Sequence, residues 1–188
     1  MTGTSRVTVH MAASLDGFVA RTDGSVDWLE TADEFAAGAT MDPAEMAAFV
    51  KTIGCYVMGS HTYELALGFE AKGLGWVYGD TPTVVLTNRK LQKTRESVRF
   101  HSGDLTALIG ELRARHENIW VVGGHDVCAA CLRLGLVDDV RLSIVPVLIG
   151  EGIPFFGALT ADIPLHLAEV KAYRNGMVEM RHEVKRGG

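Results

Sequence analysis

The sequence predicts an α/β fold whose last strands are antiparallel. Three observations support this class. Short β-branched runs alternate with amphipathic segments from residue 6 to about residue 135. Near the C-terminus, Asn175-Gly176 separates two strand patterns, Leu165–Tyr173 and Met177–Val184, which is typical of a β-hairpin. Several strand patterns also end in glycine or small polar residues just before a helical pattern begins. The length of 188 residues predicts a single domain over residues 1–188.

The predicted strands are short and rich in β-branched residues. Before the C-terminal hairpin they cover Arg6–Ala13, Cys55–Met58, Thr83–Leu86, Ser97–Phe100, Ile119–Val122 and Val140–Leu148. Pro146 lies inside the last of these strands and cannot donate a ladder hydrogen bond. We therefore expect that strand to lie at a covered or bulged edge of the sheet.

The predicted helices begin at recognisable start signals. They cover Pro43–Ile53, Ser60–Leu67, Asp104–Arg115 and His125–Leu134. Asp42 is the expected N-cap of the first helix, with Pro43 at its first position. Ser60 is the expected cap of the second helix.

Composition excludes several classes of protein. The hydrophobic content of 47% and charged content of 22% are ordinary for a soluble globular protein. The formal net charge is −5 and no block of Lys or Arg occurs, which argues against nucleic acid or an anionic membrane as the main partner. No apolar run is long enough to span a bilayer, and the N-terminus lacks the apolar region of a signal peptide. We expect a cytoplasmic location.

The three cysteines, Cys55, Cys128 and Cys131, do not form a disulfide framework. Cys128 and Cys131 form C-x-x-C inside an apolar helical run, so we expect buried small side chains. A zinc site would need a second pair of ligands, and we predict no metal. A thiol-redox protein that uses this pair is a distant alternative.

The glycine pair Gly123-Gly124 follows a buried strand pattern and precedes a helix. Glycine lets the backbone approach a ligand closely, and the N–H groups at a helix start attract an anion such as phosphate. A simple turn is the alternative for this pair alone. Two further junctions, Met58–Thr62 and Leu86–Arg89, have similar character. Because strand ends of this kind meet at one rim of an α/β sheet, the three together predict a bound nucleotide.

The chain resembles the dihydrofolate reductase superfamily, in particular the reductase domain of bifunctional riboflavin-biosynthesis enzymes. The resemblance covers nearly the whole chain and rests on Met11–Gly17, Gly24–Leu29, Val57–Glu64, Val84–Asn88, Val121–Gly124, Gly135–Asp139 and Ile144–Gly152. It implies a dihydrofolate reductase-like fold, with a central mostly parallel sheet, antiparallel C-terminal strands and helices on both faces.

The resemblance also implies an oxidoreductase that uses NADPH to reduce a small heterocycle or another C=N or C=C compound. The nicotinamide would lie near Ala12, Val19 and Ala20. The pyrophosphate would lie at the two glycine-containing helix starts, which comprise Gly59, Ser60, His61, Thr62, Val122, Gly123, Gly124, His125, Asp126 and Val127. In the family a cis peptide joins the glycine pair.

The 2′-phosphate of NADPH would meet the loop formed by Leu86, Thr87, Asn88 and Arg89. Arg89 is the best cation offered, and a cation there selects NADPH over NADH. Many relatives have an arginine where this chain has Ser60, so one phosphate contact of the family is missing.

A reductase of this kind also needs a proton source. In dihydrofolate reductases an acid follows a tryptophan by five positions, and here Asp33 follows Trp28 at that spacing. Asp33 is therefore the first catalytic candidate, with Asp27 and Glu30 as alternatives and Trp28 as a wall of the pocket. The competing interpretation is that the three acids form a solvated helix start.

The family pattern is incomplete around the substrate. The segment Val77–Pro82 lacks the arginine that grips folate, and riboflavin-pathway reductases have a lysine at His10 and an acid at Val122. The alternative function is therefore a non-catalytic NADP-binding or sensor protein. Relatives often form homodimers through the C-terminal part of the sheet, and we expect a homodimer here.

Overall fold

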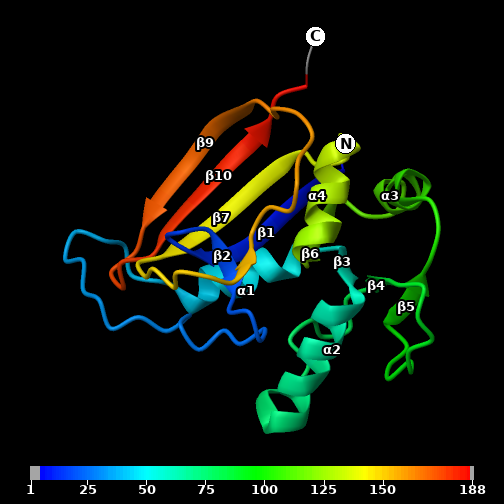
Figure 1. Cartoon of the computed structure of the whole chain (residues 1–188), viewed down its shortest axis with the longest axis horizontal. Helices are drawn as coiled ribbons and strands as arrows, with labels where there is room; N and C mark the ends of the chain where they lie inside the picture. The colour runs from blue at the N-terminus through cyan, green and yellow to red at the C-terminus, as the bar shows by residue number, and fades with distance from the viewer. Residues whose placement is uncertain (1–4, 187–188) are drawn as a thin grey trace.

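A computed structural model describes residues 5–186 and contains one large mixed sheet (Figure 1). Its eight strands have the order β5-β4-β3-β6-β1-β7-β10-β9. The bounds are β1 Arg6–Ser14, β3 Cys55–Gly59, β4 Thr83–Leu86, β5 Val98–His101, β6 Asn118–Gly123, β7 Asp139–Val145, β9 Leu165–Ala172 and β10 Val178–Val184. Neighbours from β5 to β7 pair in parallel, whereas β10 pairs antiparallel with both β7 and β9. A small separate sheet pairs β2 (Phe18–Ala20) with β8 (Ile153–Pro154).

The helices cover both faces of the large sheet, as expected. They are α1 (Pro43–Lys51), α2 (Ser60–Phe69), α3 (Leu105–Arg113) and α4 (His125–Arg133), and a π-helical turn, η1 (Glu70–Leu74), extends α2. Side chains of α3 and α4 pack with Val7 and Val9 of β1 in one core cluster. Phe49 of α1 and Tyr63 of α2 pack in a second cluster on the opposite face. The α/β class with antiparallel C-terminal strands is thus confirmed.

The residues at the two ends of the chain are not described. Residues Met1–Thr4 and Gly187–Gly188 lie outside the described part of the chain. The expectation that the N-terminus lacks a signal peptide falls partly on these residues. Within residues 5–186, every helix falls short of the length and apolar character needed to span a bilayer.

The helix starts fall into two kinds. The carboxylate of Asp42 accepts a hydrogen bond of 2.8 Å from the Ala44 N–H at the start of α1, as predicted. Asp104 accepts one of 3.0 Å from Ala107 at the start of α3. Among the described residues no side chain caps α2 or α4, whose N-cap positions are the glycines Gly59 and Gly124. The prediction that Ser60 caps α2 was therefore wrong, since Ser60 is the first residue inside the helix.

Strand β7 is not at an edge, which corrects the expectation for Val140–Leu148. It pairs with β1 on one side and β10 on the other. The strand ends at Val145, so Pro146 lies beyond the ladder and its missing N–H removes no ladder bond. Across Pro146, the Val147 N–H donates to the Val145 carbonyl at 2.8 Å. Residues 140–145 of the apolar run therefore belong to an interior strand that is paired on both sides, whereas Leu148 lies beyond it and is exposed.

The predicted C-terminal hairpin is confirmed. Gly176 donates a 3.0 Å hydrogen bond to the Tyr173 carbonyl and has φ of +77°, a conformation that glycine adopts without steric cost. The hairpin brings β9 to the edge of the sheet, where residues 165–170 are exposed.

Two aspartates tie the amino-terminal end of the sheet together. The Asp138 carboxylate accepts from the Val7 N–H at 2.8 Å, from Arg113 at 2.6 Å and from Arg186. Asp139, whose side chain is only 5% exposed, accepts from Arg6 at 2.6 Å and from Arg181 at 3.0 Å. These bonds join β1, α3, β7 and β10 at the end of the sheet that lies opposite the strand-to-helix junctions.

The N-caps provide a test of this packing. We expect Asp104→Ala to lower the free energy of unfolding by about 1 kcal/mol, because α3 is part of the core and the change leaves an N–H unpaired. Asp42→Ala should lower it less, by roughly 0.5 kcal/mol, because the described residues of α1 include none that is buried. Urea denaturation would measure both. Equal losses would contradict the view that α1 contributes little to the core.

Candidate functional site

The three predicted strand-to-helix junctions lie on one rim of the sheet. Register aligns Gly59 at the end of β3 with Leu86 at the end of β4, and Met58 with Gly123 of β6. Because these strands are parallel, their carboxyl ends face the same side. The junctions at Leu86, Gly59 and Gly123 therefore follow one another along the rim, in the strand order β4-β3-β6.

The glycines at two of these junctions allow a very close approach of backbones. A Cβ atom placed on Gly59 would lie 3.3 Å from Val127 Cγ2 and 3.8 Å from the Gly124 nitrogen. Gly123 has φ of +129°, and a Cβ atom there would lie 2.9 Å from the sulfur of Met11. The Gly123–Gly124 peptide is cis, as the family resemblance implied. A larger residue at Gly59 would press against Val127 of α4, and one at Gly123 would press against Met11 of β1.

The amino-terminal ends of α2 and α4 consequently lie side by side. The Thr62 hydroxyl oxygen is 3.8 Å from the Cβ position of Gly124 and 3.9 Å from that of Gly123, so α2 borders directly on the glycine pair. Between Val57 and Met58 the pairing of β3 with β6 shifts by one residue, which leaves Val122 as a bulge just before the glycines. Among the described residues no side chain caps either of these two adjacent helix starts, and uncapped helix starts attract an anion.

The loop after β4 places the predicted 2′-phosphate residues next to α2. The Thr87 N–H donates to the His101 carbonyl at 2.9 Å, and the Thr87 hydroxyl accepts from the Arg89 N–H at 3.0 Å. Asn88 is exposed. The Arg89 guanidinium donates to both carboxylate oxygens of Glu64, at 2.9 and 2.6 Å. The predicted cation is therefore on the rim but already has an anionic partner.

The polar residues at the helix starts are accessible. His61 is exposed at the start of α2. The side chain of Asp126 is 92% exposed, and the His125 Nε2 atom lies 3.2 Å from its carboxylate. A carboxylate repels an anion, so at the start of α4 only the backbone N–H groups could attract one.

The loop after β1 is held in place by Asp16. Its carboxylate accepts from the Gly150 N–H at 2.8 Å, from the Ile149 N–H at 3.1 Å and from the Ser14 hydroxyl at 2.6 Å. These bonds lower the pKa of Asp16, with the Ser14 hydroxyl as the main cause. They fix the turn that connects Ala12 in β1 with Val19 and Ala20 in β2, the residues predicted to contact the nicotinamide.

The predicted acids lie in different surroundings. Asp33 is exposed and touches the hairpin turn at Gly176, next to Pro146 at the end of β7. Asp27 is bound by Arg21 at 2.7 and 3.3 Å, and this hydrogen bond lowers the pKa of Asp27. An acid held in its ionised form is a poor proton donor, which leaves Asp33 as the better candidate. Trp28 is buried, and its indole N–H has no partner among the described residues.

His10 lies in the core rather than on the rim. Its ring stacks on Trp120 with centroids 4.8 Å apart, and its Nε2 atom is 3.2 Å from the Ser143 hydroxyl. Burial, with a smaller contribution from Arg141, lowers the pKa of His10 to about 3. The imidazole is therefore neutral, and its 4.0 Å approach to Glu179 is not an ion pair.

Two residues of the rim were missed by the sequence reasoning, Glu64 and Met11. Glu64 contacts Arg89 although 25 residues separate them, and only the parallel pairing of β3 with β4 brings them together. Met11 faces Gly123 because β1 is the neighbour of β6. The alternation of β1 indicates which face Met11 occupies but not its contact with the glycine pair.

The thiol-redox alternative lacks an accessible thiol. Cys128 and Cys131 are free and wholly buried in the core cluster beneath α4. Burial raises the pKa of both thiols, that of Cys131 to about 12, so they stay protonated.

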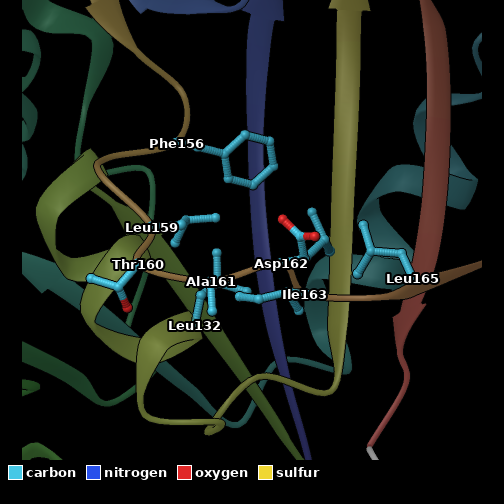
Figure 2. Close-up of a pocket in the computed structure, with 9 residues that line it drawn as sticks. Leu132, Phe156, Leu159, Thr160, Ala161, Asp162, Ile163 and Leu165 are labelled. Carbon is cyan, nitrogen blue, oxygen red and sulfur yellow. The ribbon is translucent and has the colours of Figure 1, made fainter.

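A separate apolar groove of about 550 Å³ lies away from this rim (Figure 2). It runs between the end of α4 and the start of β9, and its lining is Leu132, Val140, Phe156, Leu159, Thr160, Ala161, Asp162, Ile163 and Leu165. Val140 lies near the start of β7, so the groove is closer to the amino-terminal end of the parallel strands than to their carboxyl ends.

Several known proteins are similar to this chain over nearly its whole length. YwjB of Bacillus subtilis (strain 168), itself uncharacterised, is 30% identical over 183 residues, which are 96% of this chain and 98% of YwjB. A protein from Shewanella sp. PV-4 whose name refers to riboflavin biosynthesis has a structure with a TM-score of 0.81 and 25% identity, over 96% of this chain and 99% of its own. Dihydrofolate reductase from Enterococcus faecalis, solved with NADP(H), shares the fold with a TM-score of 0.59 and 15% identity, over 97% and 98% of the two chains.

The family model described as the RibD C-terminal domain matches residues 56–179. This match starts within β3 and ends in β10, so it includes the strand-to-helix junctions described above. The chain therefore belongs to the RibD C-terminal domain family.

Proposed function

We propose that this protein binds NADPH along the rim and transfers hydride to a small heterocycle or another C=N or C=C compound. One observation carries the proposal. Asp side chains cap α1 and α3, whereas glycines begin α2 and α4, and those two starts lie side by side. Free N–H groups at two adjacent helix starts suit a pyrophosphate, which is an extended anion with oxygens on two phosphorus atoms.

The residues along the rim fit such a cofactor. The backbone of residues 60–62 and 125–127 would hold the pyrophosphate, and Arg89 would meet the 2′-phosphate. Ala12, Val19 and Ala20 offer small apolar contacts at the end of β1 and in β2, where a flat nicotinamide would lie. The cofactor supplies the hydride, and the chain supplies position, charge and the proton.

The surroundings of the substrate differ from those of the relatives that reduce folate or a ribosyl pyrimidine. Residues 77–82 contain no arginine to bind a glutamate tail. The neutral His10 is in the core, and Val122 has no charge to offer to a polar substrate. We therefore favour a flat, weakly charged substrate. The same two residues also favour the alternative function, an NADP-binding sensor without turnover.

Asp33 is the proposed proton donor. It lies at the end of β7, whose last residue Val145 is aligned with Ser14 at the end of β1. This position is one strand away from the residues proposed to contact the nicotinamide.

The cofactor proposal predicts that NADPH raises the melting temperature of the protein. A ligand at 100 times its Kd stabilises the native state by about 2.7 kcal/mol. Thr62→Val should weaken NADPH binding by about five- to tenfold through loss of one hydroxyl. Thr52→Val at the opposite end of the sheet is the matched control, because its hydroxyl only donates to the Phe49 carbonyl. The melting temperatures of the wild-type protein and of both variants would be measured with and without nucleotide. A wild-type melting temperature that neither NADPH nor NADH raises would reject the proposal.

The acid proposal predicts that Asp33→Asn lowers turnover about 100-fold, the usual contribution of a positioned general acid, while NADPH binding is unchanged. NADPH oxidation against a panel of pterins, pyrimidinones and quinones would supply the assay. Asp27→Asn should have little effect, because Asp27 is already ionised and paired with Arg21. If Asp27→Asn lowered turnover and Asp33→Asn did not, Asp27 would be the proton donor instead. Tight NADPH binding without oxidation across the panel would favour the sensor.

The protein is proposed to act as a homodimer through the exposed apolar side chains of the C-terminal hairpin. Register places Leu165, Leu167 and Val170 of β9 on the same face as Val140 and Met180, which is the face of α4. The three β9 side chains are 38%, 51% and 55% exposed, and Leu165 also lines the apolar groove (Figure 2). A contiguous apolar surface of this kind is typical of an interface between subunits. A cytoplasmic location stays a prediction from the sequence.

The dimer proposal predicts that Leu167→Glu produces a monomer, because it buries a charge in the interface. His166→Glu on the opposite face of the same strand is the matched control and should leave the dimer intact. Sedimentation velocity at micromolar concentration distinguishes these states. A wild-type monomer would rule out the homodimer.

A further inference from the structure

The cation best placed for a 2′-phosphate is held by a carboxylate. Both terminal nitrogens of Arg89 donate to Glu64, at 2.9 and 2.6 Å, in a two-pronged ion pair. The pair lies between the loop after β4 and the second turn of α2, at the rim proposed for the cofactor. The side chains are 52% and 40% exposed, so an incoming anion can reach them.

A second ion pair nearby, between Arg95 and Glu70 at the start of η1, has different surroundings. Arg95 binds Glu70 with the same separation of 25 residues in the chain, at 2.7 and 2.8 Å. Arg95 is only 20% exposed and lies over the Trp76 ring at 4.1 Å, so its role is to pack. Arg89 is 52% exposed at the rim instead, so an anion could reach it if it displaced Glu64.

Glu64 opposes a phosphate at Arg89 in two ways. It occupies the two terminal nitrogens that a phosphate would use for the strongest bidentate contact. Its own negative charge would also repel a 2′-phosphate within a few ångströms. Arg89 lowers the pKa of Glu64, so the carboxylate is ionised at neutral pH.

We propose that Glu64 is a specificity-determining residue that competes with the 2′-phosphate of the cofactor for Arg89. This inference rests on the proposed nucleotide site. Its consequence is a protein that discriminates only weakly between NADPH and NADH. Removal of the Glu64 charge releases Arg89 and strengthens the preference for the 2′-phosphate.

The experiment measures binding of adenosine 2′,5′-bisphosphate and adenosine 5′-monophosphate by calorimetry, because these probes differ only in the 2′-phosphate. We expect Glu64→Gln to tighten binding of the bisphosphate by roughly two- to fivefold, as removal of one exposed opposing charge allows, and to leave binding of the monophosphate unchanged. Arg89→Gln should bring the two probes to equal affinity. In the double variant Glu64→Gln/Arg89→Gln the gain should vanish, since Glu64 acts only through Arg89.

Glu70→Gln is the matched control, because it removes the corresponding carboxylate from the Arg95 pair and should change neither affinity. An unchanged or weaker bisphosphate affinity in Glu64→Gln would overturn the inference, and a weaker one would mean that Glu64 orients Arg89. If Glu64→Gln tightened binding of both probes equally, the effect of Glu64 would not involve the 2′-phosphate, and the inference would be overturned as well. If wild-type protein binds neither the probes nor NADPH and NADH, the proposed nucleotide site itself fails.

Discussion

The parallel register of β3, β4 and β6 is the constraint on which the rest of the rim depends. It aligns Gly59 with Leu86 and Met58 with Gly123, so three chain segments leave the sheet at the same level. A slip of one residue would turn the buried side chains of a strand to the opposite face. The core on both faces therefore fixes the position of the junctions. Glycines then determine how closely the junctions approach, because a side chain at residue 59 or 123 would meet Val127 or Met11.

Helix α1 is held to the sheet by contacts with charged side chains as well as by the partly buried Phe49. Lys171 of β9 binds Glu45 at 2.9 Å, and the Arg141 guanidinium lies over the Phe49 ring at 4.8 Å. Within the described chain, α1 contributes no buried residue. Elements with little buried apolar surface open locally at low cost in free energy. We therefore expect α1 to open locally more readily than α3 or α4, which contribute buried residues to the core.

Most of the fold could be predicted because its strands and helices have distinct periodicities and start signals. The bounds of β4 and the cap Asp42 follow from local sequence alone. The errors arose where a local signal had two explanations. Pro146 suggested an edge strand, but it lies just outside β7, and Ser60 suggested a cap, but Gly59 takes that position. Contacts such as that of Glu64 with Arg89 depend on how strands pair, and no local pattern encodes them.

The charged groups at the two ends of the sheet differ in how completely they are paired, and this difference supports the proposed site at the rim. At the amino-terminal end, Asp138 and Asp139 satisfy the Val7 N–H and neutralise arginines from β1, α3 and β10. Buried polar groups with complete partners stabilise and have nothing left to offer a ligand. At the other end, two helix starts keep their N–H groups without side-chain caps from the described residues, and Arg89 has only an exposed partner that an anion can displace. An end of the sheet with unsatisfied donors costs stability unless a ligand supplies the acceptors. The rim is thus the part of this molecule whose free energy a bound nucleotide would lower most.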